Sequence, residues 1–394
     1  MSEHGVIVEV DAGYHDRENT VVYAPAACHE EHTCHAVHEV DDSGNQGEAM
    51  PAQCVGVCEC FGDEVDPECE AMVAFIVPKL AAGEKKRFAI CTDECECADG
   101  GVSVEVDEEK SATFMINGDL FTRYNFDREK FVRPNAYPVL GPKGVEVTEY
   151  ASSDHPHHKS LYVALGEVNG FDNWSEQEGH SYIYTQALDV VAEGPIFAQL
   201  LAVNDWVNPK GVKFMEDWTL ITVYNSPEGA RLMDWDITLA ATECGIHIGD
   251  TKESGTLSVR MNTPLHVRNG GTMVNAYGGM MEAENWGKPS PWVDYHGELD
   301  GVKCGLTLMD HPANLRFPTT WHVRNYGLFT ANCWGYSYFT GDQSVRGDYT
   351  MPHGDSVNFL YRVYVHAGNH CEAKVRDRWF DFAYAPKVTV VGEE

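Results

Sequence analysis

The feature of this 394-residue sequence that most constrains its fold is an alternation of apolar and polar residues with a period of two. Between positions 233 and 239, Met, Trp, Ile and Leu alternate with Asp, Asp and Thr, and a similar alternation recurs between positions 359 and 365. Successive side chains of an extended chain point to opposite faces, so this pattern is typical of half-buried β-strands. Many such segments, without amphipathic helices between them, predict an all-β fold built as an antiparallel β-sandwich.

Further strand-like segments are separated by clusters of Gly, Pro, Asn and Asp, which favour turns. They cover residues 161–166, 196–203, 218–224, 256–261, 305–309 and 326–331. One helix is predicted close to the C-terminus, where Val375, Trp379 and Phe382 follow helical spacing. The hydrophobic content of 43% is enough for a large core, which excludes a wholly disordered chain.

Acidic residues are concentrated in the first part of the chain. The sequence holds 61 Asp and Glu against 28 Lys and Arg, and residues 1–109 alone hold 26 acidic and 5 basic residues. We therefore predict an acidic, Cys-rich small β domain over residues 1–115 and a main β-sandwich domain over 116–394, which carries the active site. The strands expected in the first domain cover residues 5–10, 20–23, 36–40, 52–57, 72–77 and 87–91.

The composition also narrows the class of partner. A net charge of -33 disfavours nucleic acid and anionic membrane surfaces, because both are bound through Lys and Arg. A membrane-spanning helix needs about 20 apolar residues, and the apolar runs here are far shorter. The first residues lack a basic segment followed by an apolar one, which predicts a cytoplasmic protein. The expected partner is a small-molecule or oligosaccharide substrate, and the oligomeric state is left open.

Several common catalytic motifs are missing from the sequence. It contains no P-loop, no G-x-G-x-x-G after a strand, no G-x-S-x-G and no H-E-x-x-H. Nucleotide-dependent, hydrolase-elbow and zincin mechanisms therefore lose their usual sequence support.

The densest group of reactive side chains reads DHPHHKS and starts at Asp154. In an extended chain His155 and His157 project to one side and His158 to the other, so two imidazoles can line one pocket. Imidazole transfers protons near neutral pH and is also a common metal ligand. The alternative is that these histidines only satisfy buried backbone groups. On the functional interpretation, further substrate contacts come from Asp154, Lys159, Asn169, Trp174 and Glu176.

A second group lies toward the C-terminus, within the sequence TWHVRNYG from Thr320. Alternation places His322 and Arg324 on one face of a strand, with Asn325 beside them. An arginine paired with an imidazole base can hold a substrate carboxylate through two hydrogen bonds. The alternative, equally weighted, is a packing cluster of arginine and aromatic side chains.

Between these groups, indoles stand close to polar side chains. Trp286 precedes Lys288, and Trp292 precedes Asp294 and Tyr295. Sugar rings stack their C–H faces on indoles while their hydroxyls bind short polar side chains. The alternative is that both tryptophans belong to the core.

These stretches carry a resemblance to a known family. The segment RPNAYPVLGP from Arg133, the DHPHHKSL segment, GEVNGFDNW ending at Trp174, and DHPANLRFPTTWHVRNYGLF from Asp310 resemble the bacterial PmoA-like family, over about residues 115–370. Lys159 stands where we expect Arg in the family motif, which keeps the charge but loses the bidentate fork. The resemblance implies a shared pocket, and the sandwich is compatible with a galactose-mutarotase-like supersandwich.

The N-terminal region holds nine of the thirteen cysteines. Cys54, Cys58 and Cys60 repeat the spacing of Cys91, Cys95 and Cys97, and a Cys/His cluster lies between residues 28 and 38. Thiolate and imidazole ligands favour zinc, so a structural Zn²⁺ is one interpretation. Free, reduced thiols are the other.

Taken together, the residues predict a carbohydrate-active enzyme, a lyase, epimerase or hydrolase of a sugar or uronide that uses histidine acid/base catalysis. The candidate catalytic residues are His155, His157, His158, His322 and Tyr295, and the candidate substrate-binding residues are Asp154, Lys159, Asn169, Trp174, Glu176, Trp286, Lys288, Asp294, Arg324 and Asn325. One alternative is a metal-dependent oxidoreductase, with an active-site divalent metal held by Asp154, His155 and His157. A second alternative is a non-catalytic sugar-binding protein.

Overall fold

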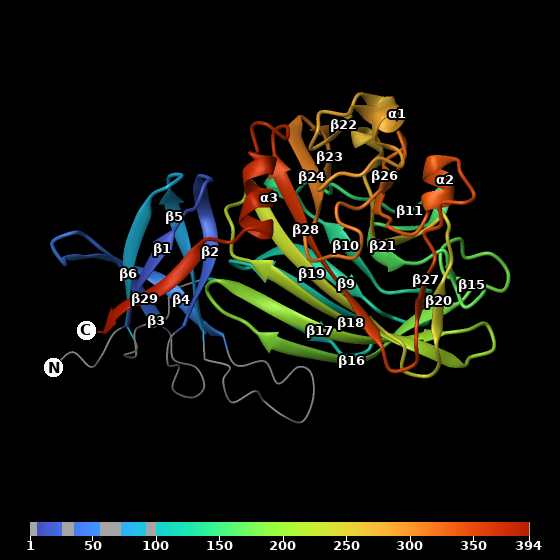
Figure 1. The fold of residues 1–394 in the computed structure, drawn as a ribbon, viewed down its shortest axis with the longest axis horizontal. Coiled ribbons are helices and arrows are strands. Elements are labelled where there is room, and N and C mark those ends of the chain that lie inside the picture. Colours follow the sequence, from blue (N-terminus) through green and yellow to red (C-terminus); the bar gives the residue numbers. More distant parts are fainter. Residues whose placement is uncertain (1–5, 26–34, 56–71, 92–99, 394) are drawn as a thin grey trace. The chain divides into compact units, whose positions relative to one another are not determined.

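The computed structural model describes residues 6–25, 35–55, 72–91 and 100–393, and these form two compact units (Figure 1). The N-terminal unit takes its residues from Met1–Val102, Ala192–Phe197 and Asp377–Glu394, and the large unit from Ser103–Val191 and Ala198–Arg376. The division falls at Val102, whereas the sequence suggested a soft boundary near residue 115. The difference arises because the strands between residues 102 and 125 belong to a sheet of the large unit.

The N-terminal unit contains one seven-stranded sheet in the order β2-β5-β4-β3-β6-β1-β29. Its strands are β1 (Val6–Asp11), β2 (Arg17–Pro25), β3 (His35–Val40), β4 (Gln46–Val55), β5 (Met72–Leu80), β6 (Lys85–Cys91) and β29 (Lys387–Glu393). Alternate residues such as Val8, Val10, Phe75 and Phe88 form the core of this unit. The described residues of the six expected segments all fall on strands; positions 5, 56 and 57 lie outside the described residues. The seventh strand, β29, comes from the other end of the chain and pairs antiparallel with β1.

A buried ion pair ties the C-terminal helix α3 (Val375–Ala383) into the N-terminal unit. Arg17 is 3% exposed, and its guanidinium donates to Asp381 Oδ1 at 3.0 Å and to the Tyr384 carbonyl at 2.8 Å. The His15 ring stacks on Phe380 with centroids 3.5 Å apart. The predicted C-terminal helix is therefore confirmed.

The large unit is built on two eight-stranded sheets. The first has the order β25-β26-β21-β13-β10-β9-β8-β7. Its strands are β7 (Val102–Asp107), β8 (Ser111–Ile116), β9 (Asp119–Asn125), β10 (Asn135–Val139), β13 (Leu161–Ala164), β21 (Gly255–Arg260), β25 (Trp321–Val323) and β26 (Leu328–Ala331). All six residues of β21 are buried, so this strand is covered on both faces.

The second sheet of the large unit has the order β16-β17-β18-β19-β28-β24-β23-β22. Its strands are β16 (Tyr182–Ala192), β17 (Phe197–Val207), β18 (Lys213–Tyr224), β19 (Ala230–Ala240), β22 (Thr272–Asn275), β23 (Trp292–Leu299), β24 (Val302–Asp310) and β28 (Ser356–Ala367). The apolar residues of the alternating segment 233–239 are buried, as predicted. The register of β19 against β28 is continuous from Ala230 to Ala240.

Shorter elements complete the large unit. A two-stranded sheet pairs β11 (Tyr150–Ser152) with β12 (His155–Lys159), and a four-stranded sheet contains β14 (Glu167–Val168), β15 (Phe171–Asp172), β20 (Ile246–Ile248) and β27 (Tyr349–Met351). Two short helices are α1 (Met281–Asn285) and α2 (Tyr336–Thr340), and single 3-10 turns cover Pro142–Gly144, Thr263–Leu265 and Val267–Asn269.

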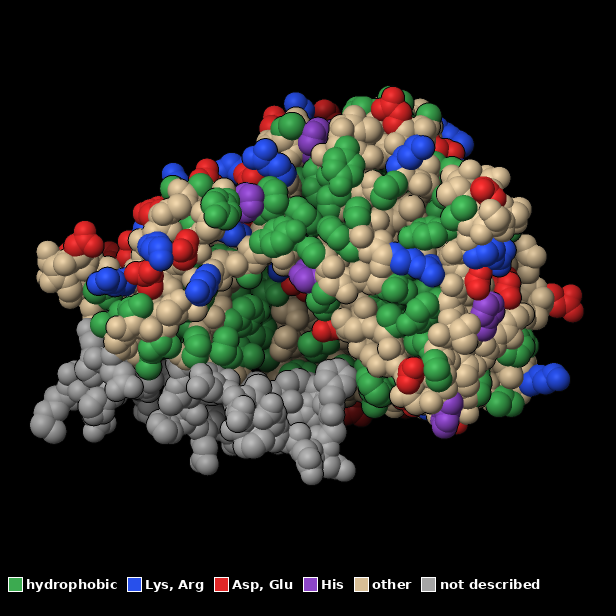
Figure 2. Space-filling view, in the orientation of Figure 1, with side chains coloured by type: hydrophobic (Ala, Val, Ile, Leu, Met, Phe, Trp, Pro, Cys, Tyr) green, Lys and Arg blue, Asp and Glu red, His purple; other side chains and the backbone are tan. Residues whose placement is uncertain are grey.

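Aromatic contacts join the two large sheets face to face. Tyr124 on β9 lies 6.3 Å from Trp235 on β19, and Tyr295 on β23 lies 5.2 Å from Phe329 on β26, both measured between ring centroids. The antiparallel β-sandwich is therefore confirmed. Within the described ranges, no helix is long and apolar enough to cross a membrane. Lys and Arg side chains stand among Asp and Glu on the face drawn in Figure 2.

Candidate functional site

The two histidine motifs meet at one place in the large unit. The hairpin β11–β12 carries His155, His157 and His158, and β12 lies beside β21, which pairs with β26 (Figure 1). β25 carries His322, and the turn that joins β25 to β26 carries Tyr326. This turn is tight because Gly327 adopts φ +91°, and a Cβ at this position would lie 2.4 Å from the His266 ring. We call these residues, together with Trp174, the histidine site.

The rings of the histidine site pack on one another. His155 stacks on Tyr326 with centroids 4.5 Å apart and on His158 at 4.8 Å. The His157 ring is perpendicular to that of His158 at 4.5 Å. All three imidazoles are therefore in mutual contact, so the strict alternation expected for an extended segment does not separate His158 from the other two. The reason is that the register of β11 against β12 shifts between Tyr150 and Ser152.

Trp174 links the two motifs from a third segment. Its ring lies 5.9 Å from His158 and 6.2 Å from His322. Asp172 fixes the backbone at Trp174, because Asp172 Oδ1 accepts a hydrogen bond from the Trp174 backbone N–H at 2.7 Å. Aspartate side chains commonly form such local turns. Trp174 is 1% exposed.

Two buried arginines frame the histidine site, and the first is Arg260 at the end of β21. It is 1% exposed, and its Nε donates to Glu149 Oε1 at 2.8 Å while a terminal nitrogen donates to Asp154 Oδ1 at 2.8 Å. Its other terminal nitrogen lies 3.3 Å from His158 Nδ1. Because a guanidinium only donates hydrogen bonds, this nitrogen of His158 must accept, which places the ring proton on Nε2.

This contact makes His158 an unsuitable proton donor. Burial lowers the pKa of His158 far below its usual value, and the charges of His157 and Arg260 lower it further. The ring is therefore neutral at neutral pH. We infer that His158 positions its neighbours, whereas the sequence alone placed it among the catalytic candidates.

The second buried arginine is Arg133, which is also 1% exposed. It donates to Glu176 Oε1 at 2.8 Å and to the Asn173 carbonyl at 2.8 Å, next to Trp174. Lys159 lies 3.1 Å from the other oxygen of Glu176 and donates to the Pro156 carbonyl at 2.7 Å. The charges of Glu176 and Lys159 are thus engaged within the protein, and they support the hairpin that carries the histidines.

His322 is the most unusual member of the site. It is 1% exposed, yet neither ring nitrogen makes a hydrogen bond. Burial lowers its pKa to about 3, although the nearby Glu253 carboxylate opposes this shift. The Lys252 backbone opposes the shift as well, as a weak hydrogen-bond partner that does not reach full hydrogen-bond geometry. A buried imidazole without a well-formed hydrogen bond requires an explanation, since buried polar groups are almost always paired.

Further buried polar atoms near Trp174 also lack hydrogen-bond partners. They are Nε1 of Trp174 itself, whose ring contacts His322, Oδ1 of the adjacent Asn173, and the hydroxyl of Tyr162, whose ring contacts Trp174. Glu253 approaches from a loop that is held close to the sheet, because a Cβ on Gly166 would lie 1.9 Å from the Glu253 carbonyl oxygen. The site therefore combines unsatisfied donors and acceptors with aromatic walls, an arrangement that suits a ligand rich in hydroxyl groups.

His155 is the histidine best placed for proton transfer. Its side chain is 30% exposed, and its Nδ1 lies 3.1 Å from Asp154 Oδ2, although the ring is not turned to form a full hydrogen bond. A carboxylate beside one ring nitrogen orients the other toward a substrate. Burial raises the pKa of Tyr326, so the stacked phenol is protonated at neutral pH. His157 also has a pKa lowered by burial and is neutral there.

Two arginine side chains, one buried and one exposed, lie against the Tyr326 ring. The buried Arg260 has its guanidinium carbon 5.1 Å from the ring centroid, and the exposed Arg268 lies at 5.3 Å. Arg324, which the sequence placed in the site, lies 5.7 Å from the Trp286 ring centroid and pairs with Glu282 at 2.9 Å. Arg324 acts on the His322 pKa and so belongs to the same region.

Other predicted residues lie elsewhere or have structural partners. Asn169 accepts the His247 backbone N–H at 2.7 Å and pins β14 to β20. Asn325 bonds the start of α1 through Glu282. Lys288 is exposed on the turn after α1. None of these contacts joins them to the histidine site.

Tyr295 and Asp294 are also separate from the histidine site in their contacts. Tyr295 is fully buried and donates its hydroxyl to the Arg324 carbonyl, and burial raises its pKa well above the usual value. Asp294 is fully buried and contacts His296 and His366. Tyr295 therefore supports the Arg324 turn from within the sandwich.

The metal ligand set considered from sequence does not form here. Among the described residues, the group of three potential ligands within 4.8 Å of one another is Asp294, His296 and His370, and not Asp154, His155 and His157. The Asp154 carboxylate instead accepts hydrogen bonds from Arg260 and Ser152 at 2.8 and 2.7 Å. These donors and the Arg260 charge, together with His155, lower its pKa below the usual value although burial opposes them.

The N-terminal cysteines fall mostly outside the described residues, as does most of the Cys/His cluster between residues 28 and 38. Cys54 is disulfide-bonded, which differs from the expectation of reduced thiols. The proposed structural zinc at this cluster stays a prediction.

Sequence reasoning missed several residues of the histidine site. Tyr326, Arg260, Arg268, Arg133 and Glu253 all act there. Arg260 carried no local signal, because its partners Asp154 and Glu149 lie more than a hundred residues away in the sequence. Glu253 lies in a loop and carried no signal either.

Comparison with solved structures and curated proteins adds little to this picture. Two crystal structures from Enterococcus faecalis, of a protein in glycosyl hydrolase family 38 and of an alpha-mannosidase, match the whole chain with TM-scores of 0.44 and 11% identity. The chain covers 48% and 46% of those two proteins, about half of their length. No curated protein matches the sequence. A family model matches residues 111–380, most of the large unit and more than half of the sequence, so the chain belongs to DUF6807, a family of unknown function.

Proposed function

We propose that the large unit is a carbohydrate-active enzyme that removes a proton from a sugar beside a carboxylate group, in an elimination or epimerisation. The observation that carries this proposal is His322, a buried imidazole without a well-formed hydrogen bond, in the same ring cluster as the partly exposed His155. A polyhydroxylated ligand would satisfy His322 and Trp174 while its ring lies against the aromatic walls.

In this proposal His155 is the general base. Proton abstraction makes an imidazolium, which the Asp154 carboxylate at 3.1 Å stabilises. Tyr326 stacks on His155 and is protonated at neutral pH, so it is the candidate to protonate the departing oxygen. The exposed guanidinium of Arg268, at the Tyr326 ring, is the candidate to bind the substrate carboxylate.

The resemblance to the bacterial PmoA-like family forms part of the proposal. Both motifs that carry the resemblance, DHPHH and WHVRNYG, contribute rings to the same site. The support is therefore their convergence in space, in addition to their similarity in sequence.

The test is a screen of uronic-acid-containing and neutral glycans, in which ultraviolet absorption reports a conjugated unsaturated product and a chemical assay reports new reducing ends. Elimination gives both signals, hydrolysis gives only reducing ends, and epimerisation requires analysis of the recovered sugar by NMR. We expect unsaturated product with uronides, lost in His155→Ala and retained in His247→Ala, a substitution of an exposed histidine on β20.

Other outcomes would overturn the mechanism. Reducing ends without unsaturation would leave a carbohydrate enzyme but exclude elimination. A glycan that binds the protein and is recovered unchanged would favour a sugar-binding protein. If no glycan binds or reacts, the carbohydrate assignment fails.

A further inference from the structure

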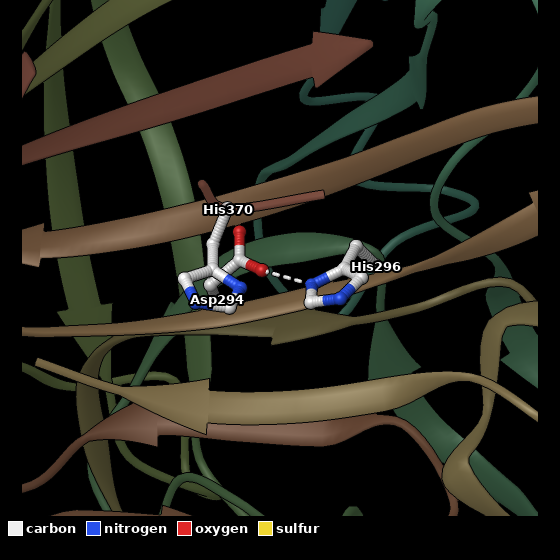
Figure 3. Close-up of side chains that lie close together, drawn as sticks. All are labelled: Asp294, His296 and His370. Carbon is white, nitrogen blue, oxygen red and sulfur yellow. Dashed lines mark hydrogen bonds and ion pairs between the residues drawn. The ribbon is translucent and has the colours of Figure 1, made fainter. Parts of the chain in front are cut away.

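A second cluster of ionisable side chains lies in the large unit, apart from the histidine site in its contacts. It comprises Asp294 and His296 on β23 and His370 in the loop that follows β28. One ligand atom from each lies within 4.8 Å of the others. Figure 3 shows the Asp294 carboxylate and the two imidazole rings grouped together, with a hydrogen bond from His296 to Asp294.

The strand register builds this cluster. Asp294 and His296 are two residues apart on β23, so their side chains share a face. Across the sheet, Gly305 on β24 is paired with His296 on one side and with His366 of β28 on the other. A Cβ on Gly305 would lie 2.6 Å from His366 Cε1 and 2.7 Å from His296 Cβ. Glycine at this position is therefore what lets two imidazoles flank Asp294.

Hydrogen bonds fix the orientation of the Asp294 carboxylate. It is fully buried, and its Oδ2 accepts hydrogen bonds from Thr307 Oγ1 and His366 Nε2, both at 2.7 Å. Its Oδ1 faces His296 Nδ1 at 2.5 Å. Such second-layer hydrogen bonds are the usual way in which proteins orient a metal-binding carboxylate.

His370 supplies the third potential ligand, and one of its ring nitrogens has no hydrogen-bond partner. Its Nδ1 is buried and makes no hydrogen bond, while its Nε2 lies 3.2 Å from Cys371 Sγ. The His370 ring centroid lies 5.3 Å from that of His296. An unpartnered buried imidazole nitrogen next to a buried carboxylate offers a lone pair where a cation would be stabilised.

Space is available beside the cluster. A cleft of about 300 Å³ is lined by His296, Glu298, Lys303, Asn369 and Glu372, with glycines between them. Of the three cluster residues, His296 lines this cleft, so water can approach the cluster from the His296 side. Access for water distinguishes an open metal site from a closed structural one.

We propose that Asp294, His296 and His370 bind a divalent transition-metal ion, with Zn²⁺ as the first candidate. Two imidazoles and one carboxylate match the ligand preferences of zinc and disfavour Mg²⁺ and Ca²⁺, which prefer oxygen ligands. Tetrahedral ligand atoms about 2.1 Å from zinc lie about 3.4 Å apart. Asp294 Oδ1 and His296 Nδ1 form a hydrogen bond at 2.5 Å, so a metal ion would replace the shared proton and move these two atoms apart.

The experiment measures zinc and cobalt binding to the full chain after removal of metal by a chelator. The N-terminal cysteines can bind metal too, so the measured quantity is the difference between the wild-type protein and His370→Ala. We expect the variant to bind one equivalent less Zn²⁺. With Co²⁺, the difference spectrum should show weak visible bands without the intense thiolate charge-transfer band that cysteine ligands produce.

Two further variants make the test specific. Thr307→Val removes only a hydrogen bond to the Asp294 carboxylate and should weaken zinc binding about 10- to 100-fold. His247→Ala changes an exposed histidine on β20 and should leave the stoichiometry unchanged. Circular dichroism in chelator checks that each variant is folded.

The proposal is overturned if His370→Ala is folded and binds as much zinc as the wild-type protein. It is also overturned if the lost equivalent carries thiolate bands, because the ligands would then be cysteines. The glycan assay is independent of these outcomes, so a failure here does not bear on the histidine site.

Discussion

Two buried polar regions of the large unit differ in how completely their hydrogen bonds are satisfied. Asp217 on β18 is 1% exposed and accepts hydrogen bonds from Asn204, Trp206 and Thr219 at 2.7 to 2.8 Å. His322, equally buried, has no hydrogen-bond partner for either nitrogen. The Asp217 network is closed, in the sense that its hydrogen bonds are satisfied, and it stabilises the sandwich. The histidine site is open in the sense that buried polar atoms there are left for a ligand to satisfy. The difference separates a structural polar region from a candidate functional one.

The largest expected effect tests whether chemistry is confined to the open region. On a glycan substrate found by the screen, His155→Ala should lower kcat by about 100- to 10,000-fold, because it removes the proposed general base. Thr219→Val, in the closed network, should leave kcat unchanged, since its only role is a hydrogen bond to Asp217. Steady-state kinetics of both variants measures these changes in kcat. Equal losses of kcat in the two variants would show that chemistry is not confined to the open region.

The next effect tests the arginine frame of the open region. Arg260→Met should destabilise the large unit by about 2 to 3 kcal/mol, because it leaves Glu149 and the partly exposed Asp154 without their buried partner. Arg268→Met, at the same Tyr326 ring but exposed, should change stability by less than about 0.5 kcal/mol.

Urea unfolding followed by tryptophan fluorescence measures this difference, since eight of the nine tryptophans lie in the large unit. Similar losses of stability in both arginine variants would show that burial of Arg260 does not support the site. Arg268→Met should instead raise the KM for a uronide.

The two regions should also respond to pH in opposite directions. The pKa of His322 is lowered to about 3 by burial, so between pH 3 and about 6.5 the unfolded chain binds a proton that the folded chain does not, and stability rises with pH. The pKa of Asp217 is raised to about 6 by burial, in spite of three hydrogen bonds that lower it. Between about pH 4 and 6 the folded chain therefore holds the extra proton, and stability falls as pH rises.

Substitutions isolate the contribution of each residue to the pH dependence of stability. His322→Gln should remove a gain of about 2 kcal/mol between pH 5 and 6.5, so that stability rises less steeply with pH, while the contributions of His158 and Asp217 stay in place. Asp217→Asn should remove the falling contribution and make stability rise more steeply with pH. Urea midpoints at several pH values provide the measurement, and parallel curves for the two variants would contradict the assignment.

How far the sequence predicts this structure depends on how local each feature is. The alternation at residues 233–239 is local, and it correctly places a strand and its buried face. The meeting of His155 with Tyr326 is long-range, and the sequence did not predict it. The register that sets Gly305 between His296 and His366 has no signature in the sequence, because a shift of the pairing by two residues keeps the same faces buried.

For charged and polar residues, too, the prediction depends on whether their partners are close in the sequence. Arg260 is buried through partners that lie more than a hundred residues away, Asp154 and Glu149, so neither its burial nor its role could be read from its neighbours. Tyr295 follows an indole and an aspartate in sequence and was therefore interpreted as part of a sugar site. The fold points its hydroxyl at the Arg324 carbonyl within the sandwich.

The smallest effect compares one substitution in the two regions. Trp206 donates its Nε1–H to Asp217 Oδ2 at 2.7 Å, whereas Trp174 Nε1 has no partner, and both side chains are buried. Trp206→Phe leaves a buried carboxylate oxygen without its donor, so it should cost about 1 to 2 kcal/mol more than Trp174→Phe, which loses packing alone. Urea unfolding compares the two costs. Equal costs would mean that the Trp174 indole N–H is satisfied in solution, and a KM unchanged by Trp174→Phe would remove it from the ligand site.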